Sequence, residues 1–131
     1  MLEPAQFAVN EAWIIFRLNE APISTEADGD FNVFCLMDAA SCYILSNEFV
    51  PIHLAGVPES AATRLVEAGR SQAQVLPQKL LIPLELEPCE VANLAEQFGA
   101  EVSRVPEAQL SPFTSEAKEG FLAHVGGGKV Q

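Results

Sequence analysis

The chain has 131 residues, of which 49% are hydrophobic and 19% are charged, and its formal net charge at pH 7 is −11. This length and composition fit one globular domain that buries roughly two thirds of its unfolded surface, and they exclude a disordered chain. No apolar run approaches the ~20 residues of a membrane helix, and the acidic excess opposes nucleic-acid binding, which draws its affinity from Lys and Arg.

The first residues indicate a cytoplasmic protein, and the cysteines and histidines give no sign of a metal site. Glu3 stands where a signal peptide needs a basic residue. The three cysteines, Cys35, Cys42 and Cys89, cannot all pair, and Cys35 and Cys42 lie in apolar segments, where a thiol behaves as a small hydrophobe. The chain has no Cys-x-x-Cys pair and its two histidines stand apart, so it has no zinc signature, and we expect no cofactor.

Residues 12–18 predict the first strand. Trp13, Ile15 and Arg17 share one face, and the apolar residues between them share the other, so we expect the second face to be the better buried. If this strand lies at a sheet edge, its apolar residues are the expected place of self-association. Residues 19–30 have the composition of a loop.

Residues 31–51 predict a hairpin at the heart of a sheet. Two apolar runs, 33–37 and 42–45, flank the tetrad Asp38-Ala39-Ala40-Ser41. Asp at the first position and Ser at the last are typical of a tight turn, and runs that are apolar on both faces favour the sheet centre. Pro51 should lie at an edge or a bulge, because it cannot donate to a ladder.

The second half of the chain alternates helices with strands. Pro58 starts a helix of about four turns, and an interrupted strand follows over 80–86, with the interruption at Pro83. Pro88 opens a second helix that stops at Gly99, and a strand over 102–105 follows. The apolar stripes are Ala61, Ala62, Leu65, Val66 and Gly69 on the first helix, and Val91, Leu94, Ala95 and Phe98 on the second.

A last helix begins at Ser111-Pro112 and turns Phe113, Ala117, Phe121 and Val125 inward. The order is therefore β-β-β-α-β-α-β-α, which predicts an α/β fold with a five-stranded mixed sheet and helices packed on it. We expect one domain over residues 1–125 and a flexible Gly-rich tail over 126–131.

The segment NVFCLMDAASCYIL and the strand-helix-Gly-strand-Pro rhythm of residues 79–106 resemble the ribonuclease H/integrase-like fold. The resemblance covers residues 31–125 in element order. It implies two-metal phosphoryl transfer with Mg²⁺ or Mn²⁺, for which carboxylates must converge. The implied ligands are Asp38 after the first matched strand, Glu85 or Glu87 where family members carry Asp, and Glu116 or Glu119 on the last helix.

The register of the strands decides whether this catalytic interpretation holds. If residues 12–18 form the first strand, Asp38 ends the second, and the position of the family's first Asp falls where the chain has Arg17, Asn19 and Glu20. In that register the metal site disappears. The chain also resembles small bacterial domains that look like non-catalytic relatives of the same topology.

Three hypotheses follow. The first is a non-catalytic domain that acts through protein contacts, with itself as a homodimer among the candidate partners, because its hydrophobic content predicts a surplus apolar patch. The second is a metal-dependent nuclease-like or transposase-like enzyme that uses the carboxylates above. The third is a small-ligand binding module at the carboxyl ends of the parallel strands, where Asp38 and Glu87 would line a cleft. We favour the first, with Asp38 as a turn residue.

Overall fold

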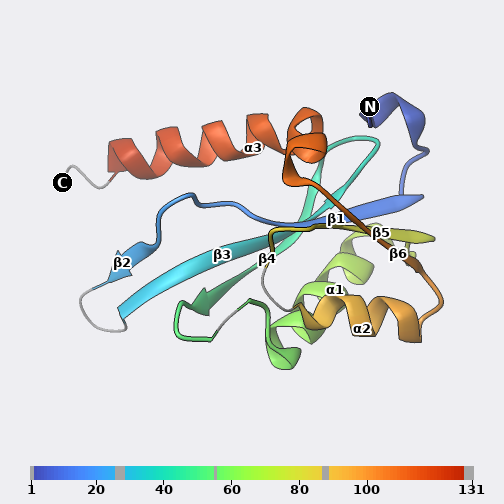
Figure 1. Ribbon diagram of the computed structural model, residues 1–131, viewed down its shortest axis with the longest axis horizontal. Coiled ribbons are helices and arrows are strands. Elements are labelled where there is room, and N and C mark those ends of the chain that lie inside the picture. Colours follow the sequence, from blue (N-terminus) through green and yellow to red (C-terminus); the bar gives the residue numbers. More distant parts are fainter. Residues whose placement is uncertain (1, 26–28, 55, 87–88, 129–131) are drawn as a thin grey trace.

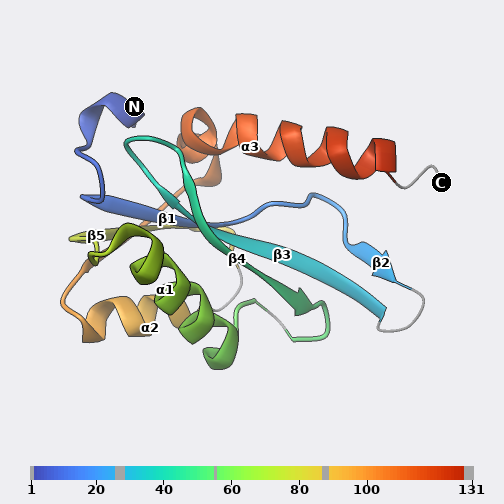
Figure 2. The same ribbon diagram turned by 180° about the vertical axis from the view of Figure 1, so that it is seen from behind.

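A mixed sheet lies between two layers of helices in the computed structural model, which describes residues 2–25, 29–54, 56–86 and 89–128. Helices α1 and α2 cover one face of the sheet, and α3 lies on the other (Figure 1, Figure 2). The elements are η1 (Pro4–Gln6), β1 (Ala12–Arg17), β2 (Ile23–Thr25), β3 (Gly29–Asp38), β4 (Ile44–Pro51), α1 (Glu59–Ala73), β5 (Lys79–Pro83), α2 (Glu90–Gln97), β6 (Glu101–Val105) and α3 (Glu107–Gly128).

The sheet confirms the predicted mixed α/β class. β1 lies between β3, to which it is antiparallel, and β5, to which it is parallel; β6 continues the parallel part. β4 pairs with β3 on the side away from β1. The sheet has six strands rather than five, because β2 pairs with the first residues of β3 inside the segment that we predicted as a loop. The ribonuclease H-like label stays a prediction.

The central position of β1 overturns two expectations. Both of its faces are buried, since Trp13 and Ile15 pack towards α1 and α2 while Ile14 and Phe16 pack towards α3. Arg17 misled the prediction because it is the exposed last residue of a strand whose other residues are all buried. A strand with neighbours on both sides has no free edge, so β1 cannot be the surface for self-association.

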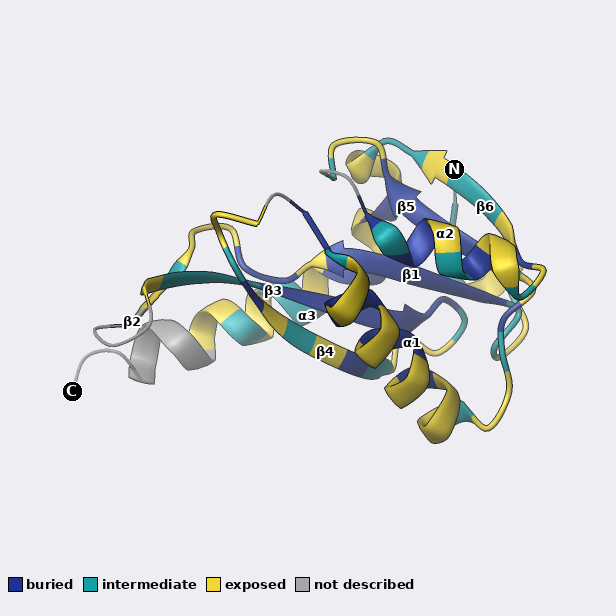
Figure 3. Ribbon diagram, turned by 90° about the horizontal axis from the view of Figure 1, so that it is seen from below, coloured by how far each residue is buried: buried dark blue, intermediate teal, exposed yellow. Residues whose placement is uncertain are grey.

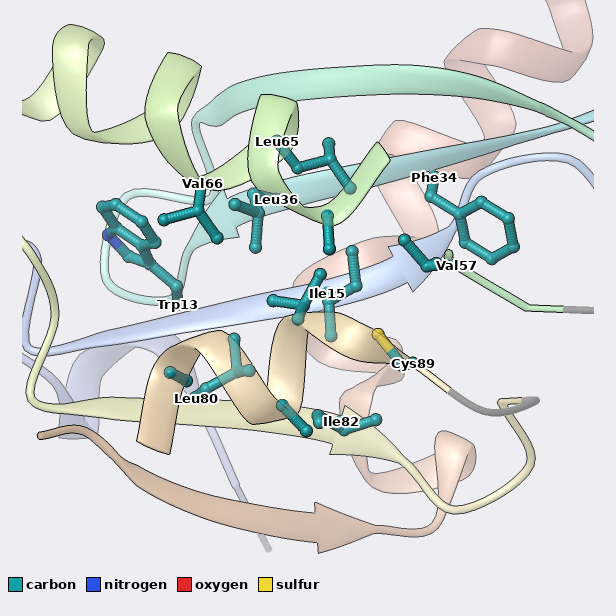
Figure 4. Packing of buried hydrophobic residues seen from close by; sticks show 14 of the residues in the cluster. Trp13, Ile15, Phe34, Leu36, Val57, Leu65, Val66, Leu80, Ile82 and Cys89 are labelled. Atoms are coloured by element: carbon teal, nitrogen blue, oxygen red, sulfur yellow. The ribbon is translucent and has the colours of Figure 1, made fainter. Parts of the chain in front are cut away.

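The core on the α1 and α2 side is built around Trp13. Its side chain is 1% exposed and lies among residues of α1, β3 and β5 (Figure 4). α1 buries the predicted stripe, and this face of α1 is buried while its outer face is exposed (Figure 3). α2 also matches its prediction and is followed by Gly99 at φ +93°, a left-handed conformation that favours glycine. Pro88 lies outside the described residues.

The other face of the sheet is covered by α3. Phe113 is buried against β1 and β3, and Ala117 and Phe121 are half-buried, as predicted, while the side chain of Val125 lies outside the described part. The helix begins at Glu107, four residues earlier than predicted, and continues through Gly128 with Pro112 inside it. Pro removes one helical hydrogen bond, and the first turns of α3 lie at an angle to the rest (Figure 1).

The strand predicted over 80–86 ends early. β5 stops at Pro83, and Leu84 beyond it is 55% exposed. Pro83 is therefore the last residue of the strand and not an interruption within it, although the N–H of Leu84 still donates to the carbonyl of Val105 at 2.8 Å. Among the described residues, no helix has the length and apolar character needed to cross a membrane.

Two glycines within helices should respond oppositely to alanine. A Cβ on Gly69 of α1 would lie 3.3 Å from the ring of Trp13, which is enclosed and cannot withdraw, whereas a Cβ on Gly120 of α3 would meet no atom within 4 Å. Gly120→Ala should raise the free energy of unfolding by about 0.5–1 kcal/mol through helix propensity. Gly69→Ala should leave the free energy of unfolding unchanged or lower it. Urea unfolding measures both, and equal gains would contradict the packing described.

Candidate functional site

The carboxylate of Asp38 is enclosed in a turn. Its Oδ2 accepts hydrogen bonds from the backbone N–H of Ser41 at 2.9 Å and from the Ser41 hydroxyl at 2.6 Å. Its Oδ1 accepts one from the backbone N–H of Asn10 at 2.7 Å. The side chain is thus satisfied by three donors, and Asp38 is 1% exposed. This is the turn chemistry expected of the Asp38–Ser41 tetrad.

The same carboxylate ties the start of β1 to the end of β3. Asn10, whose backbone N–H donates the bond described above, is at φ +63°, and its side-chain oxygen accepts a hydrogen bond from the indole N–H of Trp13 at 3.1 Å. Ala39 donates its N–H to the carbonyl of Ala12. Asp38 therefore holds the segment that leads into the central strand.

Strand directions separate Asp38 from the carboxylates predicted to join it. Trp13 is the β1 partner of both Asp38 and Leu80, so Asp38 lies level with the amino end of β5. Glu85 follows the carboxyl end of β5, at least ~10 Å further along the sheet. The two residues do not share a metal site. For the same reason Asp38 does not line a cleft at the carboxyl ends of the parallel strands.

The other predicted carboxylates have separate places. Glu85 is exposed and accepts a hydrogen bond from the backbone N–H of Glu107 at 2.9 Å, at the first residue of α3. Glu116 and Glu119 are exposed on α3, and Glu87 lies outside the described residues. In the described part of the chain, no three His, Cys, Asp or Glu side chains gather as a metal ion would need.

The cysteines are thiols in apolar or acidic surroundings. Burial raises the pKa of Cys35 to about 12 and also raises that of Cys89. Cys42 is only half-buried, and its pKa is raised first by burial and then by the negative charges of Asp38 and Glu116. Glu116 of α3 thus acts on the same thiol as Asp38, although the two carboxylates share no contact in the described part. Since the thiolate is the nucleophile, these surroundings do not activate a cysteine.

Two hollows flank the carboxyl end of β1. One, of about 190 Å³, lies on the α1 and α2 side, and we call it the carboxyl-end cleft; it is lined by Arg17, Asn32, Phe34, Gly56, Pro83, Glu85, Leu86 and Glu107. The other, of about 360 Å³, lies between the segment that follows β1 and the second half of α3, and its lining is largely apolar. Leu18, Ile23 and Phe121 line it, and Leu122 at its border is 62% exposed.

The outer edge of β4 is a third candidate surface. β4 runs for eight residues, and in the described part of the chain it pairs with β3 alone. Pro51 ends the strand, as expected of a proline at a sheet edge. We call the side of residues 44–51 that faces away from β3 the β4 edge.

Comparisons with known proteins assign no family to the chain. A scan against protein-family models finds no match, and a search of curated proteins finds none. The ribonuclease H-like resemblance and the ligand roles that it implies therefore stay predictions.

Sequence reasoning missed Arg17 as a cleft residue, and it placed the whole hairpin of residues 31–51 at the sheet centre, whereas β4 is its outer strand. A signal for the first was present, because a charged residue at the last position of an apolar strand lies where ligands bind in α/β sheets. A signal for the second was Pro51, which marks an edge strand.

Asp38→Asn should destabilise the protein without any metal present. One terminal atom of Asn donates instead of accepting, so at least one of the three donors loses its acceptor. We expect a loss of about 1–3 kcal/mol in the free energy of unfolding, and little change for the exposed control Glu119→Gln. The test is a thermal melt with and without millimolar Mg²⁺ or Mn²⁺. A metal at about 100 times its Kd would add roughly 2.7 kcal/mol; such a gain in the wild type alone would make Asp38 a metal ligand.

Glu116→Gln should speed the alkylation of Cys42. Removing this negative charge lowers the Cys42 pKa, because the charge of Glu116 is one of the causes that raise it. More thiolate is then present at a mildly alkaline pH. Iodoacetamide labelling followed by peptide mass spectrometry measures the rate, with Glu119→Gln as the control. Equal rates in all three proteins would contradict the proximity of Glu116 and Cys42.

Proposed function

We propose that this protein acts through protein contacts, and that it self-associates when the β4 edges of two copies pair as antiparallel strands. The observation that carries the proposal is an eight-residue strand whose outer side has no strand partner in the described part. An unpaired edge offers backbone donors and acceptors to another chain, and symmetric pairing of identical edges forms a closed dimer.

The hydrogen-bond pattern identifies the outward groups. Val33 directs its backbone towards β1, since its carbonyl accepts from Leu18 and its N–H donates to Asn19. The partner of Val33 on β4 is Phe49. Because the backbone groups of Val33 point towards β1, this pair exchanges no hydrogen bonds, and the N–H and carbonyl of Phe49 point away from β3. By the same alternation, Asn47 also presents its N–H and carbonyl to the β4 edge.

Exposed apolar side chains accompany these groups. Phe49 and Tyr43 are each 55% exposed, and the ring of Phe49 contacts that of Phe31 in an edge-on arrangement at 6.5 Å. Ile52 and Leu54, just beyond the strand, are also exposed. Aromatic residues at such a place supply apolar contact area at an interface.

The charged residues and the proline near the β4 edge do not block pairing at its middle. Proteins protect edges with charged residues or prolines. Here Pro51 stands at the end of the strand, and the charge of Glu48 is taken up by Arg64 of α1 at 2.8 Å. The net charge of −11 makes two copies repel each other. Salt screens this repulsion, so the proposed dimer should strengthen as salt is raised.

Phe49→Lys should weaken the association about tenfold or more, because a lysine at the contact must lose its hydration and adds charge to the edge. Leu84→Lys is the matched control. Leu84 is equally exposed, but it follows β5, which β1 and β3 separate from β4 in the sheet. Sedimentation velocity from low to high micromolar protein measures both variants and the wild type.

A wild type that stays monomeric at high micromolar concentration, in low and high salt, would contradict the proposal. An equal loss in the two variants would also contradict it, because the effect would then come from charge alone and not from the β4 edge.

A further inference from the structure

We infer that the carboxyl-end cleft binds a free α-amino acid, with Arg17 receiving its carboxylate and Glu85 its ammonium group. This inference goes beyond the proposed self-association and uses a different part of the molecule. It rests on the place of the cleft in the sheet, on two charges that form no ion pair among the described residues, and on the size of the cleft.

The cleft lies where α/β sheets bind ligands. The chain leaves the carboxyl end of β1 towards β2 and β3 on one side, and it leaves the carboxyl end of the neighbouring parallel strand β5 towards α2 and β6 on the other side. At such a switch point a crevice forms outside the carboxyl ends of the parallel strands. Arg17 ends β1, and Glu85 follows the end of β5, so both belong to this crevice.

Arg17 has donors to spare. Its Nε donates to the carbonyl of Asn19 at 2.8 Å, and one terminal nitrogen lies 3.5 Å from the carbonyl of Glu20. These contacts fix the side chain against the segment after β1. A guanidinium carries five N–H donors, so donors remain beyond these contacts with described residues, and their planar arrangement suits a carboxylate.

Glu85 has an oxygen to spare. One oxygen accepts the N–H of Glu107, which fixes the side chain, and its second oxygen accepts no hydrogen bond within the described part. The other acid of the cleft, Glu107, is paired with Lys118 at 2.9 Å. Arg17 and Glu85 line the same cleft, yet neither enters an ion pair within 4.0 Å among the described residues.

A zwitterion complements this arrangement better than a simple ion. An anion at Arg17 would be repelled by Glu85, and a cation at Glu85 would be repelled by Arg17, whereas a molecule with both charges satisfies both. The volume of about 190 Å³ lies below the roughly 300 Å³ at which pockets begin to hold drug-sized ligands. The side chains of Phe34 and Pro83, both buried, give the cleft an apolar wall. A free α-amino acid with a small side chain fits these limits.

The experiment titrates the full chain with glycine, alanine and serine, and follows backbone and Arg17 Nε–H signals by NMR. Propionate and ethylamine serve as ligands with one charge each. Arg17→Gln and Glu85→Gln are the test variants; the glutamine at 85 still accepts the N–H of Glu107. Arg70→Gln and Glu67→Gln, from an exposed ion pair on α1, are the matched controls. A melting curve of each variant establishes that it is folded.

We expect saturable shifts at the cleft with at least one amino acid. The wild type should bind propionate and ethylamine about tenfold more weakly than the amino acid, or worse, since each of these ligands lacks one charge-assisted contact. The two test variants should bind the amino acid more weakly by a similar factor for the same reason. The control variants should bind it as the wild type does. No saturable binding of any of the three amino acids at millimolar concentration would overturn the inference. Equal binding of propionate or ethylamine, or unchanged binding by Glu85→Gln, would also overturn it. None of these outcomes depends on whether the β4 edge pairs.

Discussion

The pairing of β1 with β3 on one side and β5 on the other is the constraint on which the remaining structure depends. A strand in this position has no free edge, and helices cover both of its faces, so every residue from Ala12 to Phe16 is buried. Trp13 then sets how closely α1 approaches, because its ring lies against Gly69. Asp38, the β3 partner of Trp13, fixes the same end of β1, since it holds Asn10 before the strand and closes the turn between β3 and β4.

This constraint moves the surfaces available for function to the periphery. The strand β1 is buried in the core, whereas four large apolar side chains on or next to the outer strand β4 are exposed: Tyr43, Phe49, Ile52 and Leu54. The charges that line a cleft stand where the parallel strands end. The two proposals concern ligands of different kinds, since a strand edge pairs with another chain and the carboxyl-end cleft suits a small zwitterion. Asp38, the residue that first drew attention as a metal ligand, is occupied by backbone and hydroxyl donors.

The sequence predicts local structure in this protein better than it predicts which strands lie beside one another in the sheet. The stripe of α1 and the turn at Asp38 depend on residues a few positions apart, so periodicity and turn chemistry suffice to find them. The central place of β1 depends on pairing with distant strands, and an alternating pattern indicates which faces are buried but not what lies beside the strand. β2 was missed because its three residues are held by β3 and not by their own propensity. The separation of Asp38 from Glu85 follows from strand direction, which a list of elements does not contain.

The central claim is that a fully paired β1 leaves the β4 edge as the surface for association. Amide hydrogen exchange resolved by residue, at low and at high protein concentration, tests this claim most directly. We predict that the amides of Ile14 and Phe16 are protected at both concentrations. The outward amides of Asn47 and Phe49 should exchange quickly in dilute solution and become protected when the protein is concentrated. If Asn47 and Phe49 exchange quickly at both concentrations, the edge does not pair; if they are protected at both, it is not the free surface described.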